Sequence, residues 1–192
     1  MCRTGGKVNL DDIRWGPSDW DALNKARRQQ HFLQVNITAE DIAICEAKAL
    51  EMGHLRNSIR QGEGNLAGFL GELAVHRWLV GSTWENTYHY DVIEAGGRAV
   101  DAKTKCCTTR PELDFECSVP AASTFQECDD YVFVRCLNDL SRLWIVGRCT
   151  KEWFMANAKL WRVGEVDPAN GWVTKADCYN CSIRNVRRST EA

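Results

Sequence analysis

The chain has 192 residues, 44% of them hydrophobic and 26% charged, and its formal net charge is −2 at pH 7. This composition is typical of a soluble globular protein of one domain. The charge excludes attraction of nucleic acid by the whole surface, although acidic metal ligands can offset local basic residues. No apolar run reaches the ~18 residues of a membrane span, and the start lacks the apolar stretch of a secretory signal. We therefore expect a cytoplasmic, intracellular protein with no membrane partner.

The first part of the chain has the apolar spacing of helices. We predict helices over residues 18–32, from Thr38 onward, and over 65–80. Thr38 is followed three residues later by Asp41, a pattern typical of a helix start. The glycine-containing segment 61–64 breaks the helical pattern. We place a boundary there, between an N-terminal helical extension (1–62) and a core domain (63–192).

From residue 88 onward the apolar period becomes that of strands. Strands are predicted over 88–93, 98–105, 131–136 and 143–149, a short helix over 120–126, and a further helix from Thr150. The expected fold class is α+β, with a mixed, mainly antiparallel sheet flanked by helices.

Two aspartates and a lysine stand out around the glycine-containing turn 95–97. Asp101 and Lys103 point to the same face of a strand because side chains alternate. A two-residue loop would put Asp91 on the opposite face, whereas a three-residue loop with a left-handed glycine pairs Asp91 with Asp101. We predict the three-residue loop because its alternation is cleaner. Segment 46–48 has the same acid-x-lysine pattern inside a predicted helix, so the pattern alone is not specific.

Two opposed aspartates repel each other unless a cation lies between them. Oxygen ligands at this spacing suit Mg²⁺ or Mn²⁺, and Lys103 can stabilise phosphate charge or act on the attacking water. Glu72 lies in a helix that we expect to be packed on both sides, and metal or water binding would compensate its burial. The alternative is that the aspartates are surface residues and that Glu72 forms an ion pair with Arg77 or Lys103.

This set of residues resembles the PD-(D/E)XK nuclease superfamily. The helix containing GELA at 71–74, then Asp91, then DAK at 101–103, follow the family's order of elements over residues 64–137. Tyr90 stands where the signature has a proline. The resemblance implies a core made of a helix, a three-stranded antiparallel meander, a second helix and a further strand.

The resemblance implies divalent-metal-dependent hydrolysis of phosphodiester bonds. Its implied metal ligands are Glu72, Asp91, Asp101 and the backbone carbonyl of Ala102, with Lys103 as a further catalytic residue. We therefore expect a Mg²⁺- or Mn²⁺-dependent deoxyribonuclease, an endonuclease with DNA as its partner. A compact chain of this kind is typical of phage or mobile-element enzymes that act in a host cell, and a homodimer would let it cut both strands.

Three more side chains are accessory candidates. His76 lies one helical turn after Glu72, Lys105 shares the face of Asp101 and Lys103, and Gln126 lies on the predicted helix after the meander, where related nucleases often place a glutamine. A core or surface position is the alternative for His76, and contact with solvent is the alternative for Lys105.

The ten cysteines are expected to be reduced, mostly buried thiols. Cys178 and Cys181 form a C-x-x-C pair, half of the ligand set of a structural zinc site, without a matching second pair. One rival to the nuclease is therefore a non-catalytic nucleic-acid-binding protein on a nuclease-like fold, stabilised by zinc. Another is an interaction protein that binds no DNA and whose acids are surface residues.

Overall fold

A computed structural model describes residues 32–52, 65–85, 87–167, 171 and 173–189. The elements are, in chain order, β1 (Leu33–Asn36), α2 (Ala39–Met52), α3 (Asn65–Trp78), β2 (Thr83–Trp84), β3 (Val92–Ile93), β4 (Ala99–Cys107), β5 (Glu116–Pro120), the 3-10 turn η2 (Ala121–Ser123), β6 (Asp130–Leu137), β7 (Arg142–Thr150), α4 (Lys151–Asn157), β8 (Lys159–Trp161), β9 (Cys178–Ser182) and α5 (Ile183–Arg188). The helix predicted over 18–32 lies outside the described residues except for Phe32.

Six strands form one sheet in the order β1-β7-β6-β4-β3-β2, and a second sheet has the order β5-β9-β8. In the larger sheet β4 and β6 run parallel, and every other neighbouring pair is antiparallel. The predicted α+β class with a mixed, mainly antiparallel sheet is confirmed. Short strands were expected on either side of the turn signal at 167–171, but their pairing into a second sheet was not predicted, because β8 and β9 are short and β9 (CYNCS) is too polar to show an apolar alternation.

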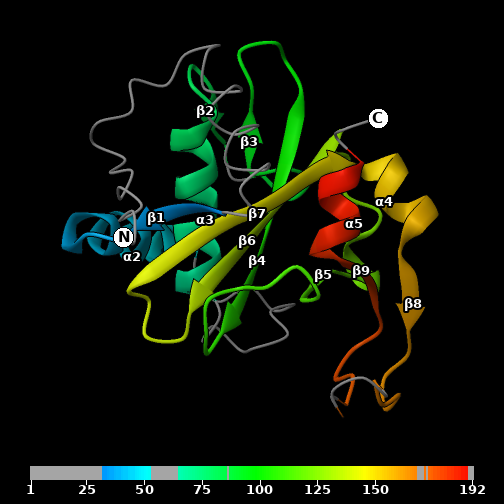
Figure 1. The fold of residues 1–192 in the computed structure, drawn as a ribbon. Coiled ribbons are helices and arrows are strands. Elements are labelled where there is room, and N and C mark those ends of the chain that lie inside the picture. The colour runs from blue at the N-terminus through cyan, green and yellow to red at the C-terminus, as the bar shows by residue number, and fades with distance from the viewer. Residues whose placement is uncertain (1–31, 53–64, 86, 168–170, 172, 190–192) are drawn as a thin grey trace, which may run out of the picture.

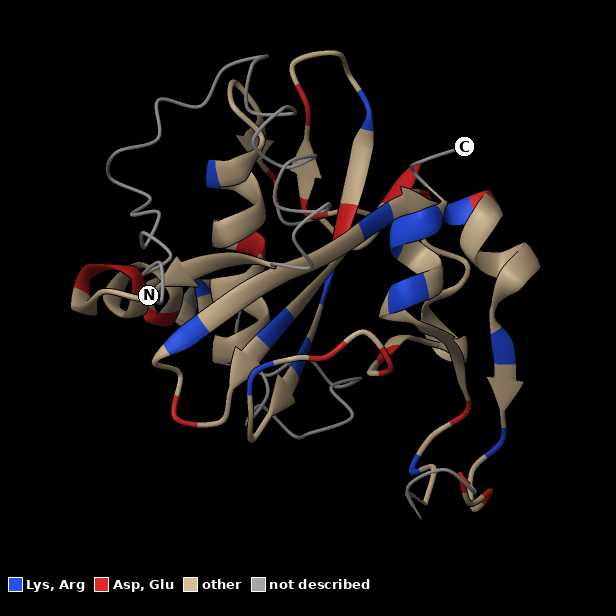
Figure 2. Cartoon of the chain, in the orientation of Figure 1, with Lys and Arg blue, Asp and Glu red and all other residues tan. Residues whose placement is uncertain are grey.

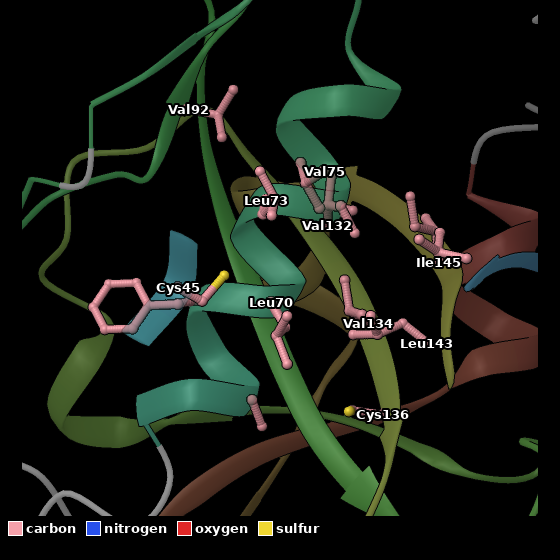
Figure 3. Packing of buried hydrophobic residues seen from close by; sticks show 14 of the residues in the cluster. Cys45, Leu70, Leu73, Val75, Val92, Val132, Val134, Cys136, Leu143 and Ile145 are labelled. Atoms are coloured by element: carbon pink, nitrogen blue, oxygen red, sulfur yellow. The ribbon is translucent and has the colours of Figure 1, made fainter. Parts of the chain in front are cut away.

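Alternating side chains of the larger sheet enter two separate cores. Val132 and Val134 of β6 pack with α2 and α3, whereas Tyr131 and Phe133 of the same strand pack with α4, α5 and the smaller sheet. Figure 1 shows α2 and α3 on one side of the molecule and the smaller sheet with α4 and α5 on the other. In Figure 3 the labelled residues of α3 lie beside those of β6, so α3 is anchored directly on the central strands.

Helix α2 begins with the predicted capping residue. The Thr38 hydroxyl accepts a hydrogen bond from the Asp41 N–H (3.2 Å), and Asp41 Oδ2 accepts one from the Thr38 N–H (2.9 Å). Asp41 also forms an ion pair of 2.5 Å with Arg77, which joins α2 to α3. Strand β1, which was not predicted, pairs with β7. Residues 32–52 of the expected N-terminal extension thus contribute a strand to the sheet and a helix to its core.

Two predicted elements are shorter than expected. The strand predicted over 88–93 is limited to β3, because a turn precedes it in which the Thr87 N–H and hydroxyl both donate to the Tyr90 carbonyl (2.9 and 2.8 Å). The helix predicted over 120–126 is only the turn η2, because the Ala121 N–H bonds to the Asp177 carbonyl (2.8 Å) and the chain soon enters β6.

Gly71 sets how closely α3 approaches β4. A Cβ atom placed on Gly71 would lie 1.8 Å from Thr104 Oγ1, whereas nothing lies within 4 Å of one placed on Gly68. We expect Gly71→Ala to lower the free energy of unfolding by about 1–3 kcal/mol, because the helix must move off the strand. Gly68→Ala, the matched control, is expected to raise it by up to about 1 kcal/mol through helix propensity.

Denaturant titration measures both changes. Adding Thr104→Ala to Gly71→Ala removes the clashing hydroxyl and should restore most of the lost stability. If the double variant is no more stable than Gly71→Ala, close contact with Thr104 is not the reason for the glycine.

Candidate active site

The turn between β3 and β4 has the predicted three-residue form. The Glu94 N–H donates to the Arg98 carbonyl (3.0 Å), the Gly97 N–H donates to the Glu94 carbonyl (2.8 Å), and Gly97 has a φ of +80°. Val92 pairs with Val100. Continued by one residue, this register places Asp91 opposite Asp101.

Charged residues on the α3 side of the sheet hold this hairpin in place. Arg148 of β7 donates two hydrogen bonds of 2.8 Å to the Glu94 carboxylate and also bonds to Asp130. Arg98 forms an ion pair of 2.5 Å with Asp130. The hairpin is thereby fixed to β6 and β7, which form the centre of the sheet.

Asp91 lies directly before β3, and its side chain continues the hydrogen bonding of the strand. The Asp91 N–H donates to the Val100 carbonyl (3.0 Å), and Asp91 Oδ2 accepts from the Ala102 N–H (2.7 Å). Within the described part of the chain, β4 has no strand partner on this side from Ala102 onward. Because the N–H and C=O of one strand residue point to the same side, the Ala102 carbonyl is directed to the side of Asp91.

Asp101 and Lys103 lie on the face of β4 that points away from α3. The Asp101 side chain is 3% exposed, and its Oδ2 atom lies 2.5 Å from Lys103 Nζ. Lys103 Nζ also donates to Gln126 Oε1 (2.8 Å), and Gln126 Nε2 donates to the Tyr88 carbonyl (3.0 Å). Gln126 therefore contacts Lys103, but it lies in a loop and not in the predicted helix.

Glu72 approaches from α3, on the other side of the sheet. Its Oε2 atom accepts a hydrogen bond from Trp84 Nε1 of β2 (3.0 Å). The Lys48 ammonium lies 3.7 Å from the centre of the Trp84 ring. Figure 2 shows acidic segments on α3 and on β4, the elements that carry Glu72 and Asp101.

Sequence reasoning did not identify Trp84 or Lys48 as part of this site. Lys48 belongs to segment 46–48, which matched the acid-x-lysine pattern without partner acids, and α2 places it over Trp84. The one sequence signal that could have identified Trp84 is its place before Asp91, where the first strand of the expected meander would lie.

Burial and mutual repulsion raise the pKa values of two of the acids. Burial raises the pKa of Glu72 to about 7 although the Trp84 hydrogen bond and the Lys48 charge lower it. Burial, followed by the charges of Glu72 and Asp101, holds the pKa of Asp91 well above its usual range. The hydrogen bond from the Ala102 N–H lowers the pKa of Asp91 but does not outweigh these effects. The ammonium groups of Lys103 and Lys48 offset part of this negative charge, and a divalent cation would offset more of it.

No group of three or more His, Cys, Asp or Glu side chains is arranged to hold a metal ion as it stands in the described residues. Two of the acids are bonded to other side chains. Lys103 is within 2.5 Å of Asp101, and Trp84 bonds to Glu72, so a cation and two protein donors compete for the same oxygens. Carboxylate oxygens are nevertheless the donors that a hard divalent cation prefers.

The other two accessory candidates lie apart from the acids. His76 Nδ1 is 2.9 Å from the Ser82 hydroxyl, and its ring stacks on Trp84 with centroids 6.3 Å apart, so His76 supports Trp84. Lys105 donates to the Ser118 hydroxyl of β5 (3.2 Å) and faces the smaller sheet. Burial and then the charge of Arg135 lower the pKa of Lys105.

Cys178 and Cys181 both lie in β9. Residues three apart in a strand point to opposite faces. Cys181 is buried in the second core and pairs across the strands with Cys117, whereas Cys178 is half-buried. The two thiols do not converge as halves of a zinc site would.

No protein-family model matches the chain, and a search of curated proteins finds no match. Among the described residues, no helix combines the length and the apolar character needed to cross a membrane.

Proposed function

We propose that this chain is a divalent-metal-dependent nuclease that hydrolyses DNA phosphodiester bonds. The proposal rests on one observation: Asp91 bonds to the Ala102 backbone where β3 separates from β4, beside the Asp101–Lys103 pair, and Glu72 is near enough for its charge to act on Asp91. Buried carboxylates are costly unless a cation or a proton neutralises them. A fold that gathers three of them from separate elements, with one lysine, is suited to binding a cation.

The donor set fits Mg²⁺ or Mn²⁺. Glu72, Asp91, Asp101 and the Ala102 carbonyl would hold the cation, which would polarise a phosphate oxygen and lower the pKa of bound water. Lys103 lies beside Asp101 with Gln126 as its second partner, and from there its ammonium can offset negative charge that develops on a phosphate.

The order of elements supports a nuclease of the PD-(D/E)XK kind. Helix α3 is followed by the antiparallel strands β2, β3 and β4, and then by β6, which runs parallel to β4. This order agrees with the resemblance, apart from β5 and the turn η2, which lie between β4 and β6 in place of the second helix. An endonuclease that works as a homodimer inside the cell, encoded by a phage or mobile element, is the finer form of the same proposal.

A cleavage assay tests the proposal. Plasmid and single-stranded DNA are incubated with the purified chain in Mg²⁺, Mn²⁺ or EDTA. We expect cutting with either cation and none in EDTA. Asp101→Ala should reduce the rate more than about a hundredfold, since it removes a metal ligand and the partner of Lys103. Asp114→Ala, at an exposed position before β5, is the matched control.

Undiminished cutting by Asp101→Ala would overturn the assignment. Absence of cutting by the parent on every DNA and RNA substrate would favour the rival, a nucleic-acid-binding protein without catalytic activity.

A further inference from the structure

Two aromatic side chains lie side by side on the surface near the candidate active site. Tyr88 is 62% exposed and Phe125 is 53% exposed. Their ring centroids are 5.3 Å apart and their planes differ by 28°, and the His89 ring meets Tyr88 edge-on with centroids 5.6 Å apart. Single exposed apolar side chains are common, but adjoining rings form a continuous flat surface, which is typical of a binding site.

This aromatic pair is connected to Lys103 through one side chain. Gln126 Nε2 donates to the Tyr88 carbonyl (3.0 Å), and Gln126 Oε1 accepts from Lys103 Nζ (2.8 Å). Phe125 is the residue before Gln126, and Tyr88 lies three residues before Asp91. A molecule with a phosphate at Lys103 would therefore have its neighbouring groups close to the two rings.

Hydrogen bonds fix the backbone under both rings. The Thr87 hydroxyl accepts from the N–H groups of His89 (3.2 Å) and Tyr90 (3.1 Å). The Glu127 N–H bonds to His89 Nδ1 (3.2 Å), and the Lys151 ammonium bonds to the Gln126 carbonyl. The backbone that carries the rings is held in place before a ligand arrives, which reduces the conformational entropy that binding costs.

We propose that Tyr88 and Phe125 form a platform on which an unpaired base of single-stranded DNA stacks, next to the phosphate that is cut. This inference rests on the proposed nuclease function and names its substrate class. Every base offers a planar face to an aromatic ring, and the neighbouring lysine supplies the cation for the adjoining phosphate. In a continuous duplex those faces are covered by adjacent base pairs, so the platform favours an unpaired strand.

A second copy of the chain fits this surface less well than a base. A stable protein interface buries about 800 Å² per partner, far more than two rings provide. The combination of planar rings with a phosphate-binding cation is the chemistry of a nucleotide.

Fluorescence anisotropy tests the platform without catalysis. A labelled single-stranded oligonucleotide and a duplex of the same sequence are titrated with protein in Ca²⁺, whose longer, irregular coordination replaces that of Mg²⁺. Tyr88→Ala and Phe125→Ala should each weaken binding of the single strand about tenfold and leave duplex binding unchanged. Tyr88→Ala keeps the backbone bond to Gln126, and Tyr88→Phe should bind like the parent.

Leu50→Ala is the matched control, because Leu50 is an exposed apolar residue of α2 (82% exposed). An oligonucleotide that carries 2-aminopurine gives a second reading: its fluorescence should be quenched on the parent and restored on the Tyr88→Ala/Phe125→Ala double variant. Equal single-strand binding by the parent and both alanine variants overturns the platform.

The two proposals fail in different ways. If Asp101→Ala cuts like the parent while Tyr88→Ala binds weakly, the nuclease assignment is wrong and the stacking surface stands. If Asp101→Ala has lost cutting while the alanine variants at the platform bind normally, the stacking surface is wrong and the nuclease stands.

Discussion

Asp91→Asn is expected to abolish DNA cleavage and, at the same time, to stabilise the metal-free protein. The rate of cleavage should fall more than about a hundredfold, because a neutral amide is a poor ligand for Mg²⁺. Stability should rise because burial and the charges of Glu72 and Asp101 penalise the ionised Asp91. The amide oxygen still accepts the hydrogen bond from Ala102. Cleavage assays and denaturant titration in EDTA measure the two effects.

The pH at which the stability gain appears identifies its cause. The pKa of Asp91 is raised in the folded state above its ordinary value of 3.8. The gain should therefore be absent below about pH 3.8, where both states are protonated, and should grow as pH rises.

Asp91→Ala is the contrasting variant. It removes the same charge but leaves the Ala102 N–H without its acceptor, which costs about 1–3 kcal/mol. We expect Asp91→Ala to be less stable than Asp91→Asn by about that amount. If the two variants are equally stable, the bond between Asp91 and Ala102 contributes nothing to the fold.

Stability of the metal-free protein is expected to fall as pH rises through about 7, with Glu72 as a main cause. Its pKa rises from 4.5 to about 7 on folding, chiefly through burial. Such a group costs no stability below pH 4.5 and costs most once it is ionised in the folded state above pH 7. The free energy of unfolding should therefore decrease by about 2–4 kcal/mol across this range from Glu72 alone. Mg²⁺ binds the ionised form, so its stabilising effect should be large above pH 7 and vanish towards pH 4.5.

Glu72→Gln isolates this contribution. The glutamine can still accept the Trp84 hydrogen bond, but it has no charge to bury. The lowered pKa of His76 acts in the opposite direction over the same pH range, so the difference between the parent and Glu72→Gln is the relevant quantity. Trp84→Phe should move the midpoint of that difference upward, because the indole hydrogen bond lowers the pKa of Glu72. Parallel pH profiles for the parent and Glu72→Gln would contradict the assignment.

Local sequence signals were sufficient to predict several helices and turns. Thr38 with Asp41 marked the start of α2, and the small and apolar residues around Glu72 marked α3 as a helix packed on both sides. The cleaner alternation of the strands around turn 95–97 favoured the three-residue loop, and that loop determined that Asp91 lies opposite Asp101. Each of these features depends on residues within a few positions of one another, where backbone preference and side-chain period act directly.

Other features depend on residues far apart in the chain. Strand β1 exists through its pairing with β7, and β9 through its pairing with β5 and β8, so neither has a strong pattern of its own. The 3-10 turn η2 replaced a predicted helix because a carbonyl near β9 binds the Ala121 N–H.

In the candidate site, too, some positions were predicted from local sequence and others depend on distant contacts. Strand alternation and the hairpin register were enough to place Asp91, Asp101 and Lys103 together, and helix position was enough to select Glu72. The tertiary structure decided the rest: Trp84 and Lys48 lie at Glu72, Gln126 bonds to Lys103, and His76 and Lys105 turn elsewhere. It also raised the pKa values of Glu72 and Asp91, because desolvation and charge repulsion depend on distances in space that the sequence period does not encode.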